Sequence, residues 1–187
     1  HGLRLVHVSS DFVFGVDSSR DSPYTESDET GPLGAYAVSK LGGELHVRSG
    51  CPDHLVVRTC GLYGHAARRR ERGGNFVETM LRLAAGGGPL KVVDDQRCTP
   101  TSTVVLAAAI DALIESGSTG LYHATCSGST TWCGFAREIF ERSGLDVEVE
   151  GITTAEFGAA AARPGYSVLD CSRLVRDTGY SPPDWQD

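Results

Sequence analysis

The feature that most limits the fold is the alternation of short apolar runs with amphipathic segments along the chain. Runs of the strand type occupy residues 3–8, 55–59, 90–93, 120–124 and 147–152. Segments of the helical type lie between or after them, at residues 35–48, 75–85, 103–115, 131–143 and 154–162. Because strands that alternate with helices usually form parallel sheets, this order predicts an α/β protein with a mostly parallel sheet.

Composition and charge narrow the class of protein further. The chain has 187 residues, 40% hydrophobic and 22% charged, which is typical of one soluble domain with at most a small appendage. Its net charge of −7 argues against nucleic acid or a membrane surface as a partner, and the one basic cluster, residues 68–70, is expected in a solvated loop. No signal peptide is visible, and the longest apolar run, residues 104–110, is too short to cross a bilayer. We therefore expect a cytoplasmic protein.

The cysteines show no spacing that would give them a special role. No two form a Cys-x-x-Cys pair and no histidine stands at finger-like spacing, so no metal site is predicted. Cysteines of cytoplasmic proteins are normally reduced, and we expect these to be small, mostly buried core residues. The six positions are Cys51, Cys60, Cys98, Cys126, Cys133 and Cys171.

The strongest local signal for chemistry is the pentapeptide Tyr36-Ala-Val-Ser-Lys40 in the first predicted helix. Residues four apart lie on one helix face, so the phenol and the ammonium group are neighbours. A phenol has a reference pKa of about 10, and an adjacent ammonium group lowers such a pKa by stabilising the phenolate. The pair predicts a proton donor for a carbonyl that receives a hydride. A surface tyrosine beside a solvated lysine would give the same spacing.

Polar residues follow the first two predicted strands. Ser9, Ser10 and Asp11 stand at the end of the first strand, and residues 60–64 form a glycine-flanked turn after the second. Ligands of parallel α/β sheets bind at the carboxyl ends of the strands. A hydroxyl at Ser10 is therefore placed to hold a substrate carbonyl oxygen while Tyr36 protonates it.

This order of strand, hydroxyl cluster, Tyr-x-x-x-Lys helix and strand with a glycine turn is that of short-chain dehydrogenase/reductases. The chain resembles the C-terminal two-thirds of an extended member of that group, and within it most resembles the dTDP-4-dehydrorhamnose reductase family. The matching stretches are VSSDFVF (8–14), YAVSKLGGE (36–44), VVRTCGLYG (56–64), GGNFVETMLRLA (73–84), VVDDQ (92–96), PT (100–101), GLYHA (120–124), FAREIF (135–140) and RPGYSVLD (163–170).

The resemblance implies a catalytic group of three residues. Tyr36 resembles the catalytic acid, and Lys40 resembles the residue that hydrogen-bonds the nicotinamide ribose. Ser10 stands where the family usually has threonine, whose hydroxyl binds the 4-keto oxygen. Tyr36, Lys40 and Ser9 are the implied cofactor-binding residues, NADPH or NADH is the implied cofactor, and no metal ligand is assigned.

The same resemblance implies substrate contacts at Ser10, Asp11, Gly61, Asn75 and Arg163. Some family members carry a tryptophan that touches the sugar where this chain has Gly61. Plainer roles stay open beside these, because Asp11 could be a turn or cap residue and Asn75 a helix N-cap.

Four other residues are expected to be structural. Arg58 ends an apolar strand, where a buried charge needs an ionic partner. His123 lies in a core strand, and Trp132 lies on the apolar face of a helix. Cys60 is expected to lie behind the Gly61 turn, since nothing in the sequence marks it as a reactive thiol.

The expected architecture is the C-terminal part of a Rossmann-type doubly wound parallel sheet plus a small α/β substrate-binding subdomain. Residues 1–64 would complete the NAD(P)-binding domain. Residues 65–187 would mainly form the substrate-binding part, with a helix and strand near 103–124 returning to the sheet. No glycine-rich strand–turn–helix motif for a pyrophosphate is present, so we expect an N-terminally truncated chain that binds NADPH poorly and exposes a sheet edge.

The resemblance implies an NAD(P)H-dependent reductase that converts dTDP-4-dehydro-L-rhamnose to dTDP-L-rhamnose. A dTDP-sugar would be the substrate, and a homodimer is a possible state. Two alternatives remain. One is a non-catalytic regulatory subunit of the methionine adenosyltransferase type, and the other is a related sugar-nucleotide epimerase or dehydratase.

Overall fold

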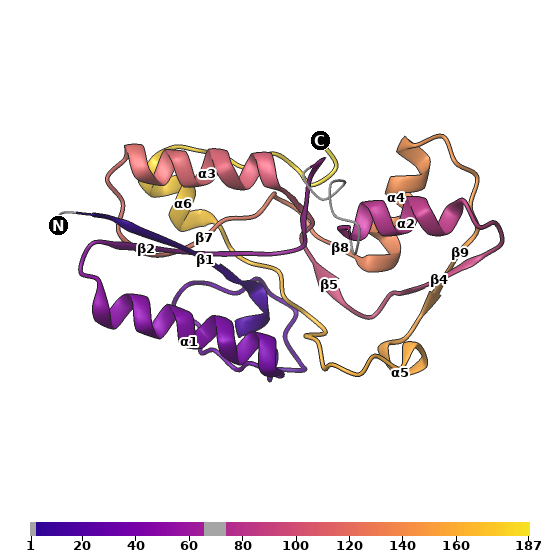
Figure 1. Cartoon of the computed structure of the whole chain (residues 1–187), viewed down its shortest axis with the longest axis horizontal. Helices are drawn as coiled ribbons and strands as arrows, with labels where there is room; N and C mark the ends of the chain where they lie inside the picture. The colour runs from indigo at the N-terminus through magenta and orange to yellow at the C-terminus, as the bar shows by residue number, and fades with distance from the viewer. Residues whose placement is uncertain (1–2, 66–73) are drawn as a thin grey trace.

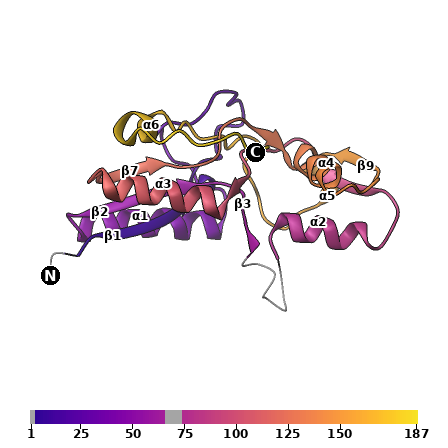
Figure 2. The ribbon, with the colours of Figure 1, turned by 90° about the horizontal axis from the view of Figure 1, so that it is seen from above.

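The computed structural model describes residues 3–65 and 74–187, so the basic cluster at 68–70 lies outside the described residues. The secondary-structure elements form two groups at opposite ends of the long axis (Figures 1 and 2). One group is built around a three-stranded sheet with helices on both faces. The other consists of helices with short strands.

The three-stranded sheet consists of β1 (Leu5–Ser10), β2 (His54–Thr59) and β7 (Gly120–His123), in the order β1-β2-β7. Both pairings are parallel, as the sequence predicts. The first strand begins and ends two residues later than predicted, so Ser9 and Ser10 belong to it. The strand is followed directly by a 3₁₀ turn, η1 (Asp11–Val13).

Helices cover both faces of this sheet. Helix α1 (Ala35–Gly50) lies on one face, and α3 (Thr103–Glu115) and α6 (Ser172–Thr178) lie on the other (Figure 1). Side chains alternate along a strand, so each strand of a sheet covered on both faces contributes to two cores. Leu55 and Val57 of β2 pack with Leu106, Leu113 and Leu174 of the two helices α3 and α6.

The second group of elements encloses a separate apolar core. It contains α2 (Phe76–Ala84), α4 (Trp132–Arg142), α5 (Thr154–Phe157) and the parallel pair β4 (Leu90–Val93) and β9 (Val149–Ile152). Phe76 lies between Trp132, at 4.8 Å between ring centroids, and Phe135, at 5.4 Å. The predicted packing role of Trp132 is confirmed by this cluster.

Two small strand pairs lie between the groups. Strand β3 (Leu62–Tyr63) is parallel to β6 (Thr101–Ser102), and β5 (Arg97–Cys98) is antiparallel to β8 (Thr130–Thr131). Helix α3 and strand β7 follow these pairs and lie with the three-stranded sheet. The division of the chain at residues 64 and 65 stays a prediction.

The C-terminal region departs most from the sequence-based expectation. The helix predicted over residues 154–162 ends at Phe157, because Gly158 adopts a left-handed conformation with φ 64° and closes it. Helix α6 was not predicted in the polar tail. It has seven residues and one buried side chain, Leu174, too little for an amphipathic period to be visible.

The cysteines agree with the sequence-based expectation of reduced, mostly buried thiols. All six cysteines are free thiols, and Cys60, Cys98, Cys126 and Cys133 are buried. Over residues 3–65 and 74–187, no helix has both the length and the apolar character that crossing a membrane requires.

His123 is a fully buried histidine at the end of β7. Its Nδ1 lies 3.0 Å from the Tyr24 carbonyl oxygen, and the edge of its ring faces Phe14 at 5.8 Å between centroids. Desolvation lowers the pKa of His123 to about 3, and the nearby positive charge of Arg58 adds to that shift. The imidazole is therefore neutral, and its expected role as a packing residue is confirmed.

This buried imidazole predicts an acid-sensitive fold. The folded chain keeps His123 neutral, while the unfolded chain protonates it below its ordinary pKa of 6.5. The stability is complete above that value and falls by up to about 1.4 kcal/mol per pH unit as the pH drops towards about 3. Urea unfolding of wild type and His123→Asn, whose amide can still reach the Tyr24 carbonyl, measures this. Wild type should lose more stability on acidification, and equal slopes would contradict the prediction.

Candidate active site

The candidate site forms where β1 ends and α1 begins. Ser10 is the last residue of β1 and caps η1, and the chain then makes a long loop before α1 starts at Ala35. The backbone of Tyr24 ties this loop to the C-terminal segment, donating to the Val168 carbonyl at 2.8 Å. The loop leaves β1 at its carboxyl end and leads to α1, which begins near the same end of that strand.

Lys40 of α1 contacts β1, and Tyr36 of the same helix contacts η1. Lys40 Nζ donates a hydrogen bond to the Val8 carbonyl oxygen at 2.6 Å. Tyr36, one turn earlier, is 58% exposed, and its ring meets the Phe12 ring edge-on at 5.9 Å between centroids. The structure thus brings Lys40 against Val8, the residue before Ser9 in β1, and Tyr36 against Phe12 just after the strand.

Ser10 carries a buried hydroxyl group at the same end of the strand. Its Oγ accepts a hydrogen bond from the Phe12 backbone N–H at 3.2 Å and donates to Asp11 Oδ1 at 3.0 Å. Ser10 is therefore the N-cap of η1, and its hydroxyl is held beside the Asp11 carboxyl group.

Asp11 is a buried carboxyl group with polar neighbours. Burial raises the pKa of Asp11, while hydrogen bonds from Cys60, Ser167 and Ser10 oppose that shift. The proposed turn role fits its place in η1. Its contact with a substrate stays a prediction.

Ser9 is a buried residue whose hydroxyl group is bound inside the protein, and its contact with a cofactor stays a prediction. Its Oγ donates a hydrogen bond to Glu44 Oε1 at 2.5 Å inside the protein. Glu44 also accepts two hydrogen bonds from Arg58, from Nε at 2.9 Å and from Nη2 at 2.7 Å. The predicted ion pair of Arg58 is confirmed, and the structure identifies Glu44 as its partner.

Glu44 is a residue that sequence reasoning missed. It stands four residues after Lys40, so Tyr36, Lys40 and Glu44 form one stripe along α1. The buried charge predicted at Arg58 was the available signal, because it required an acidic partner.

The remaining predicted substrate residues have clear structural surroundings. Gly61 has φ 55°, and a Cβ there would lie 3.2 Å from Pro100 Cα, which explains the absence of a larger residue. The capping alternative for Asn75 is confirmed, since its Oδ1 accepts from Glu78 N at 3.0 Å. Arg163 follows Ala162, whose carbonyl oxygen would lie 3.9 Å from a Cβ at Gly34, the N-cap of α1. Substrate contacts of all three stay predictions.

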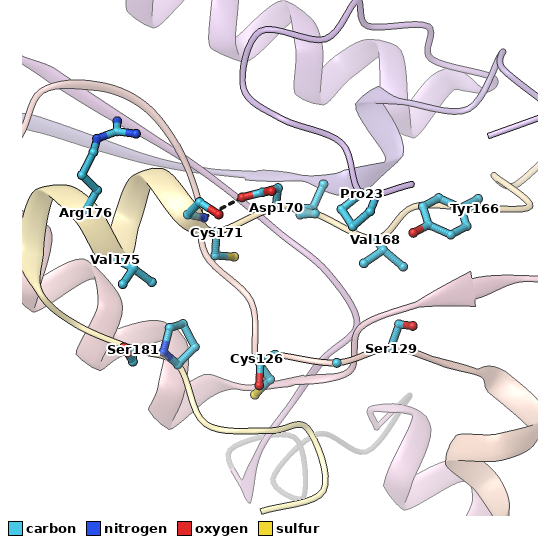
Figure 3. Close-up of a pocket in the computed structure, with 15 residues that line it drawn as sticks. Pro23, Cys126, Ser129, Tyr166, Val168, Asp170, Cys171, Val175, Arg176 and Ser181 are labelled. Carbon is cyan, nitrogen blue, oxygen red and sulfur yellow. Dashed lines mark hydrogen bonds between the residues drawn. The ribbon is translucent and has the colours of Figure 1, made fainter. Parts of the chain in front are cut away.

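A separate pocket lies on another part of the molecule. It has a volume of 670 Å³ and is lined by residues after β7, by residues 166–172 and by α6 (Figure 3). Cys126 and Val175 face it from two sides (Figure 3). None of Ser10, Tyr36 and Lys40 lines this pocket. Within the described ranges, no group of three or more His, Cys, Asp or Glu could hold a metal ion.

A parallel sheet with hydroxyl groups at a strand end, and a Tyr-x-x-x-Lys helix on that strand, is the arrangement of a short-chain dehydrogenase/reductase. The fold is the corresponding part of a Rossmann-type protein, as predicted. The chain belongs to the RmlD substrate-binding domain family, whose model matches residues 1–187.

Similar proteins support this assignment. The chain is 42% identical over 185 residues to a dTDP-4-dehydrorhamnose reductase of Mycobacterium tuberculosis, covering 97% of the chain and 59% of that protein. It is 40% identical to the spore coat polysaccharide biosynthesis protein SpsK of Bacillus subtilis, covering 100% of the chain and 62% of SpsK. A crystal structure of dTDP-4-dehydrorhamnose reductase from Bacillus anthracis in complex with NADP superposes with a TM-score of 0.90 at 37% identity, over 99% of this chain and 63% of that one. The chain thus spans about three-fifths of these relatives.

The buried carboxyl group of Asp11 predicts a second pH effect, of opposite sign to that of His123. The folded chain retains the Asp11 proton to a higher pH than the unfolded chain. The stability from protonated Asp11 is present below the ordinary aspartate pKa of about 4 and is lost as the pH rises through the raised value. Asp11→Asn does not titrate, so wild type should lose stability relative to this variant as the pH rises above about 4. Chemical denaturation of both proteins tests this, and a constant difference would contradict it.

Proposed function

We propose that this chain is part of an NAD(P)H-dependent reductase that acts on a nucleotide-linked 4-keto-6-deoxy sugar in nucleotide-sugar biosynthesis. The observations that carry the proposal are the Lys40 hydrogen bond to the Val8 carbonyl of β1 and the contact of the Tyr36 ring with Phe12, two residues after Ser10 at the end of that strand. The substrate we propose is dTDP-4-dehydro-L-rhamnose, because several relatives that match the whole chain are dTDP-4-dehydrorhamnose reductases.

The three side chains have complementary roles in this proposal. The Ser10 hydroxyl turns from Asp11 to donate a hydrogen bond to the ketone oxygen at C4. The Tyr36 hydroxyl donates its proton to that oxygen as C4 is reduced, and the Lys40 ammonium stabilises the resulting phenolate. Tyr36 suits this role because its side chain is exposed, whereas Ser10 and Asp11 are buried.

The residues present fit the nicotinamide end of a cofactor. A bound NADPH or NADH supplies the hydride that reduces C4. The Val8 carbonyl accepts one hydrogen bond from Lys40, and an ammonium group has three N–H donors, so Lys40 can also bind ribose hydroxyls. The NADP complex of the Bacillus anthracis relative supports NADPH.

The alternatives make different predictions. A regulatory subunit would need no proton donor, whereas this chain has tyrosine, lysine and a hydroxyl group at the three expected positions. Epimerase- or dehydratase-type relatives at 24% identity or less share the fold alone. We therefore favour the reductase.

Replacing Tyr36 with Phe tests the proposal. In the protein as its gene encodes it, Tyr36→Phe should lower kcat about 10²- to 10⁴-fold, because the proton donor is lost while the ring is kept. The assay follows NADPH oxidation with dTDP-4-dehydro-L-rhamnose. The matched control is Tyr180→Phe, which removes a half-buried hydroxyl that lies 3.5 Å from the Val105 carbonyl and should leave kcat unchanged.

Calorimetry with NADPH completes the experiment, since Tyr36→Phe should still bind the cofactor. Near-normal turnover by Tyr36→Phe would overturn the mechanism. Absence of turnover by wild type, together with a stoichiometric enzyme partner on purification, would favour the regulatory subunit.

A further inference from the structure

We propose that Glu44 and Arg58 are positioning residues that fix α1 on the sheet and so set the place of Tyr36 and Lys40 relative to Ser10. This inference rests on the proposed reductase function, but it concerns residues to which that function assigns no part. Neither side chain can touch a substrate, because Arg58 is 2% exposed and Glu44 is 0% exposed.

The Glu44 carboxylate joins three elements at one point. It accepts hydrogen bonds from Ser9 of β1 and, through both of its oxygens, from Arg58 of β2, while its own backbone belongs to α1. Ser9 and Arg58 are register partners in the sheet, so their side chains rise side by side towards the helix. A bidentate ion pair of this kind fixes the rotation of α1 about its axis as well as its distance from the sheet.

Arg58 is itself held in place from the other side. Its guanidinium carbon lies 5.0 Å from the centroid of the Phe14 ring, and Phe14 stacks on Tyr24 at 4.1 Å between centroids. Both rings are buried. Arg58 therefore has little freedom to follow a shift of the helix, and the helix must conform to the sheet.

The link from this pair to the candidate site is short and direct. Lys40 lies one turn before Glu44 on the same face of α1 and donates to the carbonyl of Val8, the residue before Ser9. Tyr36 lies one turn before Lys40. A rotation of α1 about its axis would move all three side chains together, and Tyr36 would leave its position beside Phe12.

The decisive variant is Glu44→Leu with Arg58→Met, made in the protein as its gene encodes it. Apolar residues of similar size can replace a buried ion pair without loss of stability, so this variant can fold. The positioning role predicts a folded protein whose kcat falls about 100-fold and whose pH profile of kcat shifts, since small misplacements of reacting groups are costly. The control, Lys91→Met with Glu150→Leu, removes an exposed ion pair of 3.6 Å and should leave kcat unchanged.

A second readout does not depend on turnover. The ¹⁵N signal of Lys40 Nζ reports its hydrogen bond to Val8 in the protein without ligand. It should move towards that of a solvated lysine in the double variant and stay in place in the control. If wild type shows no reductase activity, the proposed function fails, and this signal still decides whether the pair positions the helix.

A folded double variant with wild-type kcat and an unchanged Lys40 signal would overturn the inference. If the double variant does not fold, Glu44→Asp decides, because it keeps the charge but shortens the side chain by one methylene group. The positioning role predicts at least about a tenfold loss of kcat in a folded protein. Wild-type kcat in Glu44→Asp would then overturn the inference.

Discussion

The structure depends on the buried positive charge of Arg58, which requires an acidic partner. Arg58 is the last residue but one of the central strand β2, where both faces are covered and water is excluded. An unpaired charge in such a place costs about 3–5 kcal/mol, comparable with the whole stability of many domains. Glu44 removes that cost only when α1 lies against the sheet in one orientation. The burial of Arg58 therefore selects one orientation of α1 among the many in which a helix could pack on the sheet.

The same charge organises the loop that precedes α1. The Phe14 ring contacts the Arg58 guanidinium group and stacks on Tyr24. The Tyr24 backbone in turn pairs with the C-terminal segment at Val168 and Leu169. Residues near both ends of the described chain are thus fixed around one side chain of the central strand. The segment that carries Arg163 approaches the start of α1, because the Ala162 carbonyl oxygen would lie 3.9 Å from a Cβ at Gly34.

Much of this could be predicted from the sequence, and what could not has physical causes. The hydrophobic periodicity predicts the bounds of α1, α3 and β4 to within two residues, because long or strongly apolar elements show a clear pattern in the sequence. Tyr36 and Lys40 could be predicted as a pair because they lie only four residues apart in one helix. Helix α6 was not, since it is stabilised by the single buried residue Leu174 through tertiary contact. The inward turn of Ser9 depends on Glu44, 35 positions away, and no local pattern encodes that distance.

The junction between the two groups of elements has the character of a rigid connection. Thr101 Oγ1 donates to the Thr99 carbonyl and accepts from the Cys126 backbone N–H, and Thr99 Oγ1 donates to the Gly128 carbonyl. These threonines are buried, where hydrogen bonds are stronger and unpaired polar groups are costly. Gly61 enters the same contact region with a backbone conformation that disfavours any larger residue. The fold therefore sets the second group relative to Tyr36, because neither the junction nor α1 can turn without breaking buried hydrogen bonds.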